Sequence, residues 1–203
     1  MTKRLLTMTL LALCLMAAGV SVYAQDPIDD ANLETQLFLI LGTNQDVDDT
    51  KMPASVEPIM KQLRATLPFK NYRLAATLIN RVKNEGRLEL SWIDGPLAGP
   101  TGAASNVTPS FNQFKVRQVK LVRNNENQQI VQMLGFNFGA RIPIQTPSAV
   151  ATAGGFPTVA YESTGVSTDI SMRESEPVIV GTLNVGPSGD AIILVVSAKR
   201  APR

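Results

Sequence analysis

Apolar and polar residues alternate with a period of two along most of the chain, the pattern of β-strands that bury one face. The expected strands are residues 32–42, 87–93, 111–123, 129–145, 158–173, 177–185 and 190–199. In the second half of 32–42 and in 191–196, apolar residues occupy both faces, as expected for strands covered on both sides. The last strand is therefore expected to lie in the centre of its sheet.

One segment has the periodicity of a helix. Its apolar residues fall on one stripe at helical spacing: Val56, Ile59, Met60, Leu63 and Leu67. Ser55 is a good N-cap, Pro58 is tolerated in the first turn, and Pro68 is expected to end the helix. We expect the stripe to pack on the core.

Residues 71–83 fit both a strand and a helix. The strand is favoured, because 87–93 can pair with it across the turn Asn84-Glu85-Gly86. In 111–123 the apolar phase shifts between Val116 and Val119, which predicts a β-bulge. In 129–145 one face is expected to carry Ile130, Leu134, Phe136, Phe138, Ala140, Ile142 and Ile144, with Gln132 as an exception.

Small residues and prolines fill 95–109 and 146–157, which are expected to be flexible surface loops. The basic tail 199–203 is expected to be a frayed, solvated end. The elements together predict a mainly β fold: an antiparallel sandwich or partly rolled sheet of seven to eight strands, with one N-terminal helix packed on it.

The N-terminus has the three parts of a secretory signal peptide. Lys3 and Arg4 precede an uncharged, mostly apolar run over 5–20, and Val22-Tyr23-Ala24 resembles a signal-peptidase site. A transmembrane anchor is the alternative, but the run is short of the ~20 residues that a span needs. A lipoprotein would need Cys14, which the large Leu13 precedes. We expect cleavage after Ala24, a single domain over 25–203, no membrane span after cleavage, and a location in the periplasm or outside the cell.

Removal of 1–24 changes the composition in ways that bear on function. The remaining 179 residues carry 17 Lys+Arg and 17 Asp+Glu, so no nucleic-acid partner is expected. The only cysteine, Cys14, leaves with the signal, and export without disulfides favours a bacterium. The chain has no histidine, which excludes zinc sites built from His or Cys and removes the most common general base.

No catalytic, cofactor-binding or metal-binding residue is predicted. The acidic loop with Asp46, Asp48 and Asp49 has the oxygen ligands of calcium, and an acidic N-terminal segment could approach it, but its spacing is not that of an EF-hand. Glu174 and Glu176 flank a turn, where solubility is the simpler reason for them. The aromatic residues that could stack on a sugar are Tyr72, Tyr161 and Phe156; those expected in the core are Trp92, Phe136 and Phe138.

Residues 138–199 resemble the C-terminal part of bacterial secretin domains. The matching pieces are the strand 138–144, the Ser/Thr-rich strand 167–173, the segment 176–183 and the final apolar strand 191–199. Thr182 stands where the family has a second glycine, and the family's proline-glycine motif does not follow. The resemblance implies a shortened relative used for assembly or binding.

The leading hypothesis is an exported, non-enzymatic structural or protein-interaction module of a bacterial cell envelope, with a protein partner or further copies of itself. It could be an accessory of secretion or pilus assembly. The alternatives are a small hydrolase that uses carboxylates, which would need two of them in one cleft, and a β-sandwich that binds a glycan or another small ligand.

Overall fold

The computed structural model describes residues 31–46, 52–94, 109–146, 158–185 and 189–202. The predicted signal peptide and most of the two predicted loops, 95–109 and 146–157, lie outside the described residues. Eight strands, a short 3-10 helix and one α-helix make up the described chain.

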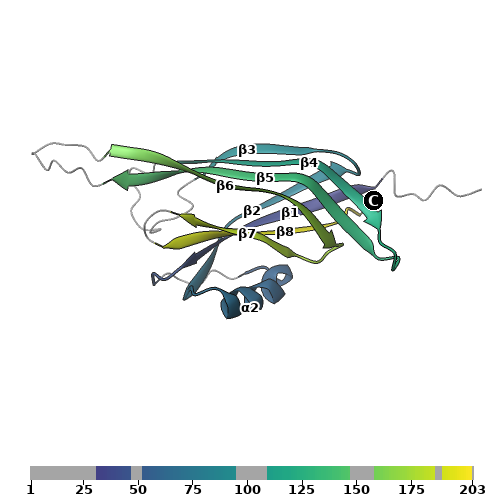
Figure 1. The fold of residues 1–203 in the computed structure, drawn as a ribbon, viewed down its shortest axis with the longest axis horizontal. Helices are drawn as coiled ribbons and strands as arrows, with labels where there is room; N and C mark the ends of the chain where they lie inside the picture. Colours follow the sequence, from purple (N-terminus) through teal and green to yellow (C-terminus); the bar gives the residue numbers. More distant parts are fainter. Residues whose placement is uncertain (1–30, 47–51, 95–108, 147–157, 186–188, 203) are drawn as a thin grey trace, which may run out of the picture.

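The strands form two four-stranded antiparallel sheets (Figure 1). Sheet A has the order β2 (Asn71–Lys83), β1 (Asn32–Thr43), β8 (Asp190–Arg200) and β7 (Val178–Val185). Sheet B has the order β3 (Leu88–Asp94), β4 (Ser110–Arg123), β5 (Gln129–Thr146) and β6 (Thr158–Arg173). The predicted fold class, a mainly β antiparallel sandwich with one helix, is confirmed, and residues 71–83 form a strand as favoured.

The main core lies between the two sheets. Sheet A contributes Leu37 and Leu39 from β1 and Leu194 from β8, and sheet B contributes aromatic residues such as Phe114 and Phe138. All five side chains are at most 1% exposed. Burial of this apolar surface is the dominant stabilising contribution to such a fold.

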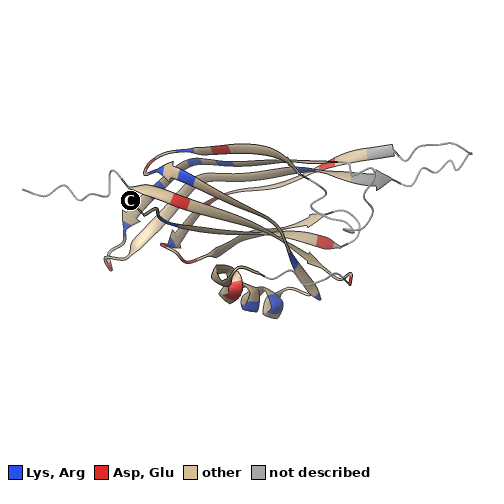
Figure 2. Cartoon of the chain, turned by 180° about the vertical axis from the view of Figure 1, so that it is seen from behind, with Lys and Arg blue, Asp and Glu red and all other residues tan. Residues whose placement is uncertain are grey.

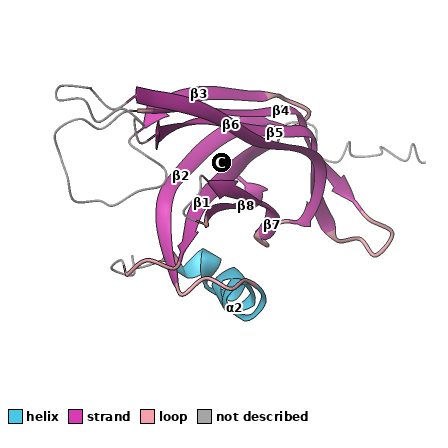
Figure 3. Cartoon of the chain, turned by 60° about the vertical axis from the view of Figure 1, so that its left-hand side comes forward, coloured by secondary structure: helices cyan, strands magenta, loops and turns pink. Residues whose placement is uncertain are grey.

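The helix α2 (Glu57–Thr66) forms a third layer on the other face of sheet A (Figure 3). Its predicted stripe packs, as expected, against Phe38 and Ile40 of β1 and against β8. Strands β1 and β8 are therefore covered on both faces, which confirms the sequence prediction for them. The predicted cap is wrong: Ser55 lies in the 3-10 helix Ala54–Val56, and no side chain caps α2.

The C-terminal end of α2 is fixed to sheet A by two aromatic residues. The hydroxyl of Tyr72 donates to the carbonyl oxygens of Leu63 at 3.1 Å and Leu67 at 3.4 Å. Phe69 meets Tyr72 edge to face and lies over Gly42 of β1, where an added Cβ would be 2.6 Å from the ring. The bare backbone at Gly42 thus lets the chain after the helix close down on the sheet.

The predicted hairpin between 71–83 and 87–93 is wrong, because β2 and β3 belong to different sheets. The turn between them is a corner that bonds to β4. Glu85 N–H donates to Val119 O, and Val119 N–H donates to Gly86 O, both at 2.8 Å. The side-chain oxygen of Asn84 accepts from Leu121 N–H at 2.8 Å. The apolar faces of β2 and β3 both turn inward, so the chain passes from sheet A to sheet B at this corner instead of folding back within one sheet.

The inward face of β5 changes at Gly135, which corrects the predicted pattern. Phe136 and Phe138 point inward as expected, but before Gly135 the buried residues are Val131 and Met133, not Ile130 and Leu134. Gly135 has a φ of 63°, and the register between β5 and β6 shifts between Met133 and Phe136. Positive φ is a conformation that glycine adopts freely. The predicted change of phase in β4 is present at the same level of the sheet, with Val116 and Val119 both buried, but the register between β4 and β5 does not shift there, so the predicted β-bulge is not found between these two strands.

The C-terminus is ordered further than predicted. Lys199 and Arg200 belong to β8, and Ala201 N–H donates to Asn32 O at 2.8 Å. Glu174 accepts from the backbone N–H of Arg200 at 2.9 Å and from its side-chain Nε at 3.0 Å. Glu174 therefore holds the β6–β7 turn to the end of β8, which goes beyond the predicted role in solubility.

Candidate functional site

The predicted acidic loop yields no metal site in the described part of the chain. Asp46 is exposed, and Asp48 and Asp49 lie outside the described residues. Among the residues that the structure describes, no three Asp, Glu, Cys or His side chains gather as metal ligands would. Figure 2 shows basic and acidic residues interspersed along the strands of both sheets.

Two of the three aromatic residues proposed for stacking are described, and they differ. Tyr72 is 1% exposed, and burial raises the pKa of its phenol, so it is a core residue and not a sugar platform. Tyr161 lies on the surface of sheet B, half-buried, with its hydroxyl donating to Pro109 O at 3.2 Å. Phe156 lies outside the described residues. Phe136, Phe138 and, less completely, Trp92 pack in the core as expected.

Each sheet ends in two edge strands: β2 and β7 in sheet A, and β3 and β6 in sheet B. The corner at 84–87 places β2 and β3 on one side of the sandwich, and the turn at 174–177 places β6 and β7 on the other (Figure 3). Because each sheet has four antiparallel strands, its two edges run in opposite directions. A second copy placed beside the first would therefore continue both sheets in antiparallel order, with β3 next to β6 and β2 next to β7.

The edge of β6 has few of the features that protect edge strands from pairing. It runs for 16 residues, against 8 in β7 and 7 in β3, and extends past the end of β7 in Figure 1. Within the described residues its ladder is with β5 alone. Proteins commonly protect edges with lysine, proline or short strands. β6 contains neither residue type, and its charged residues are Glu162, Asp169 and Arg173.

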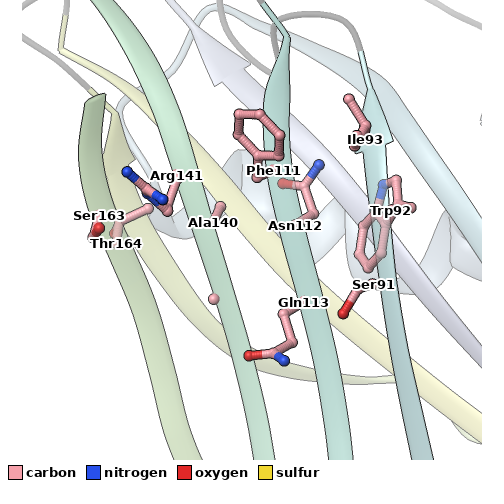
Figure 4. A pocket seen from close by; sticks show the side chains of 11 residues that line it. Ser91, Trp92, Ile93, Phe111, Asn112, Gln113, Ala140, Arg141, Ser163 and Thr164 are labelled. Carbon is pink, nitrogen blue, oxygen red and sulfur yellow. The ribbon is translucent and has the colours of Figure 1, made fainter. Parts of the chain in front are cut away.

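A hollow of about 550 Å³ lies on sheet B (Figure 4). Its lining comes from all four strands of the sheet, at residues 91–93, 111–113, 139–141 and 163–164, and includes no residue of sheet A. The hollow therefore opens on the outer face of sheet B, away from the main core. Ile93 is 67% exposed and Phe111 40% exposed, which makes them two of the three most exposed large apolar residues of the described chain.

Bare backbone in the middle of sheet B creates the floor of the hollow. Gly139 of β5 lies directly opposite Gly165 of β6. A Cβ on Gly165 would meet the carbonyl oxygen of Phe138 at 2.6 Å, so packing explains that glycine. A Cβ on Gly139 would meet nothing within 4 Å, so packing does not explain this one. Glycine inside a strand often marks a place where a ligand or another backbone comes close.

Among the described residues that line the hollow, Arg141 is the only charged one. Its guanidinium lies 5.6 Å from the ring centre of Tyr161, and that ring is 5.6 Å from Phe111. The described lining contains no carboxylate, whereas a glycosidase needs two. Sequence reasoning missed this place; the signal that could have found it is a glycine at 139 inside a regular strand pattern.

Comparison with known proteins gives a weak, partial resemblance to bacterial secretin domains. No protein-family model and no curated protein matches the chain. The chain is similar to the β-barrel of the secretin InvG from the Salmonella SPI-1 injectisome, with 10% identity and a TM-score of 0.37 over 97% of this chain and 68% of that one. InvG in its open-gate state gives 10% identity and a TM-score of 0.39 over 97% and 66% of the two chains.

A second similar structure is the type II secretion outer-membrane complex of Klebsiella pneumoniae, containing PulD, PulS and the PulC HR domain. It matches with 13% identity and a TM-score of 0.33 over 85% of this chain and 39% of that one. The resemblance predicted from residues 138–199 is thus confirmed as weak and partial. Within the described residues, no helix is both long and apolar enough to cross a membrane.

Proposed function

We propose that residues 25–203 form an exported structural module of a bacterial cell envelope, which assembles with other protein chains by strand addition at its sheet edges. The observation that carries the proposal is the long edge of β6, which pairs on one side only within the described chain. The partner that we propose for this edge is the β3 edge of a second copy, because copies placed side by side then continue both sheets in antiparallel order.

The finer parts of the proposal rest on the sequence. The signal peptide over 1–24 directs the chain to the periplasm or outside the cell, and the resemblance of 138–199 to secretin domains favours a role in secretion or pilus assembly. A head-to-tail contact of this kind makes a ring or a filament, according to whether the rotation between copies closes.

Lysine substitutions on the edge of β6 test the assembly. Ser167 and Ser171 are exposed on β6, so the double variant Ser167→Lys/Ser171→Lys should keep the fold and weaken pairing. Gln62→Lys/Ala65→Lys adds the same charge at exposed positions of α2 and is the matched control. Light scattering should show an oligomer for the mature chain and the control, and monomers for the β6 variant.

Cross-linking tests which edges meet. Because Cys14 is the only cysteine, one introduced cysteine labels one place in the mature chain. We expect a bifunctional maleimide to link Ser91→Cys on β3 to Ser167→Cys on β6 in a mixture of the two variants, and not to link either to Gln62→Cys. Two results together would contradict the proposal. The mature chain would stay monomeric, and a pull-down from the envelope would recover no protein whose binding the β6 lysines prevent.

A further inference from the structure

We propose that the hollow on sheet B is a binding site for a small amphipathic anion, whose anionic group pairs with Arg141 and whose apolar body lies over Gly139. The inference is independent of the assembly through strand edges, since the hollow lies on a face and not on an edge. Its volume of about 550 Å³ is within the roughly 300–1,000 Å³ of ligand sites in proteins.

The first argument is the unexplained glycine. Gly139 lies inside β5 between residues of regular strand conformation, and open space surrounds the position where its Cβ would be. A glycine weakens a strand relative to residues with side chains. The described structure contains no packing reason for it, whereas a ligand that needs the bare backbone as a floor supplies one.

The second argument is charge. Arg141 is exposed, and within the described residues it forms no ion pair and has no carboxylate beside it in the hollow. Its guanidinium carbon lies over the Tyr161 ring, 5.6 Å from the ring centre, within reach of a cation–π contact, and the guanidinium itself is a planar fork of N–H donors. Such a planar set of donors is suited to two-point binding of a carboxylate, sulfonate or phosphate.

The third argument is the apolar surface beside that charge. Ile93 and Phe111 line the hollow next to Arg141 in the same row of the sheet, where they are paired across β3, β4 and β5. Gln113 and Ser91 lie in the next row, and add groups that can accept or donate hydrogen bonds. An apolar body with one anionic end satisfies this arrangement, while a cation or a purely polar ligand does not.

Fluorescence titration of the mature chain with anilinonaphthalene sulfonate tests the site. This probe joins an apolar ring system to one anionic group, and N-phenylnaphthylamine is its uncharged counterpart. Saturable binding of one sulfonate probe per chain is expected. Arg141→Gln should weaken sulfonate binding about 10-fold, the size of a lost charge-assisted hydrogen bond, and leave the uncharged probe unchanged.

Gly139→Val places a branched side chain on the floor of the hollow, where an added Cβ meets nothing within 4 Å, and should weaken both probes at least 10-fold while the thermal midpoint does not fall. Arg81→Gln and Ile79→Ser remove an exposed arginine and an exposed apolar residue of sheet A, and should change neither probe. Equal loss of both probes in Arg141→Gln, or unaltered binding in Gly139→Val, would overturn the proposal.

A further experiment distinguishes a free amphipathic anion from a lipid bilayer and from a second copy of the chain. Decanoate below its micelle concentration should displace the sulfonate probe, while vesicles of phosphatidylglycerol should not sediment the protein. Sedimentation with vesicles and no displacement by decanoate would assign the surface to a bilayer and overturn the proposal. Probe binding by monomers and not by assembled chains would make the hollow an interface between copies, and would also overturn it.

Discussion

Two glycine-to-alanine substitutions in the sheets should have opposite effects on stability. Gly42→Ala would place a Cβ 2.6 Å from Phe69 Cδ2 and 2.9 Å from its Cγ, well inside ordinary contact, so the ring must move by about 1 Å. Overpacking of this kind costs about 1–3 kcal/mol. Gly139→Ala meets nothing within 4 Å, and should stabilise the fold by about 0.4–1 kcal/mol, because alanine restricts the unfolded chain.

The two variants should therefore differ by about 1.4–4 kcal/mol in free energy of unfolding, or roughly 3–16 °C in Tm for a domain of this size. Urea unfolding followed by the fluorescence of Trp92, the only tryptophan, measures the difference. A second variant tests the cause: Gly42→Ala in a Phe69→Ala background removes the clash, so the two effects should not add. Equal midpoints for the two glycine variants, or additivity with Phe69→Ala, would refute the reasoning.

Three further results are expected. Leu63→Ala, which truncates a fully buried residue of α2, should lower the free energy of unfolding by about 2–5 kcal/mol in the same urea assay. Gln62→Ala, at the exposed neighbouring position, should change that free energy by less than about 0.5 kcal/mol. Partial burial raises the pKa of Glu174, but the hydrogen bonds and charge of Arg200 outweigh it, and the pKa lies below the ordinary 4.5. The stability that Glu174 contributes is therefore complete above pH 4.5 and is lost as pH falls through its folded pKa. Glu174→Gln should lower the midpoint of urea unfolding at neutral pH and reduce the fall of that midpoint in acid. An unchanged fall in acid would contradict the assignment. Mass spectrometry of the exported chain should give an N-terminus at Gln25, and a chain that retains residues 1–24 would contradict the predicted cleavage.

The strands and the double coverage of β1 and β8 could be predicted because each depends on the pattern within one segment. Phe38 and Ile40 alternate with Leu37 and Leu39, so both faces of β1 had to be covered, and the helix and sheet B cover them. The helix stripe could be predicted for the same reason.

The errors arose where a distant segment decides the structure. The corner after β2 depends on Val119, which bonds to Glu85 and Gly86 across more than 30 residues of sequence. The reversal of the inward face in β5 depends on the positive φ of Gly135, and the alternation of apolar residues does not indicate which glycine adopts it. The hollow needs four strands side by side, so no single segment contains its pattern.

The positions of β1 and β8 also bear on when the chain can fold. The first and last strands are hydrogen-bonded neighbours in the middle of sheet A, with Leu33 opposite Arg200 and Gly42 opposite Ala191. Contacts this distant in sequence form slowly and late. Until residues 190–200 have arrived, β1 lacks one neighbour, and both the helix and sheet B lack the β8 residues on which they pack. A chain that passes through a membrane channel from its N-terminus would thus complete its middle layer only after its last strand has reached the far side.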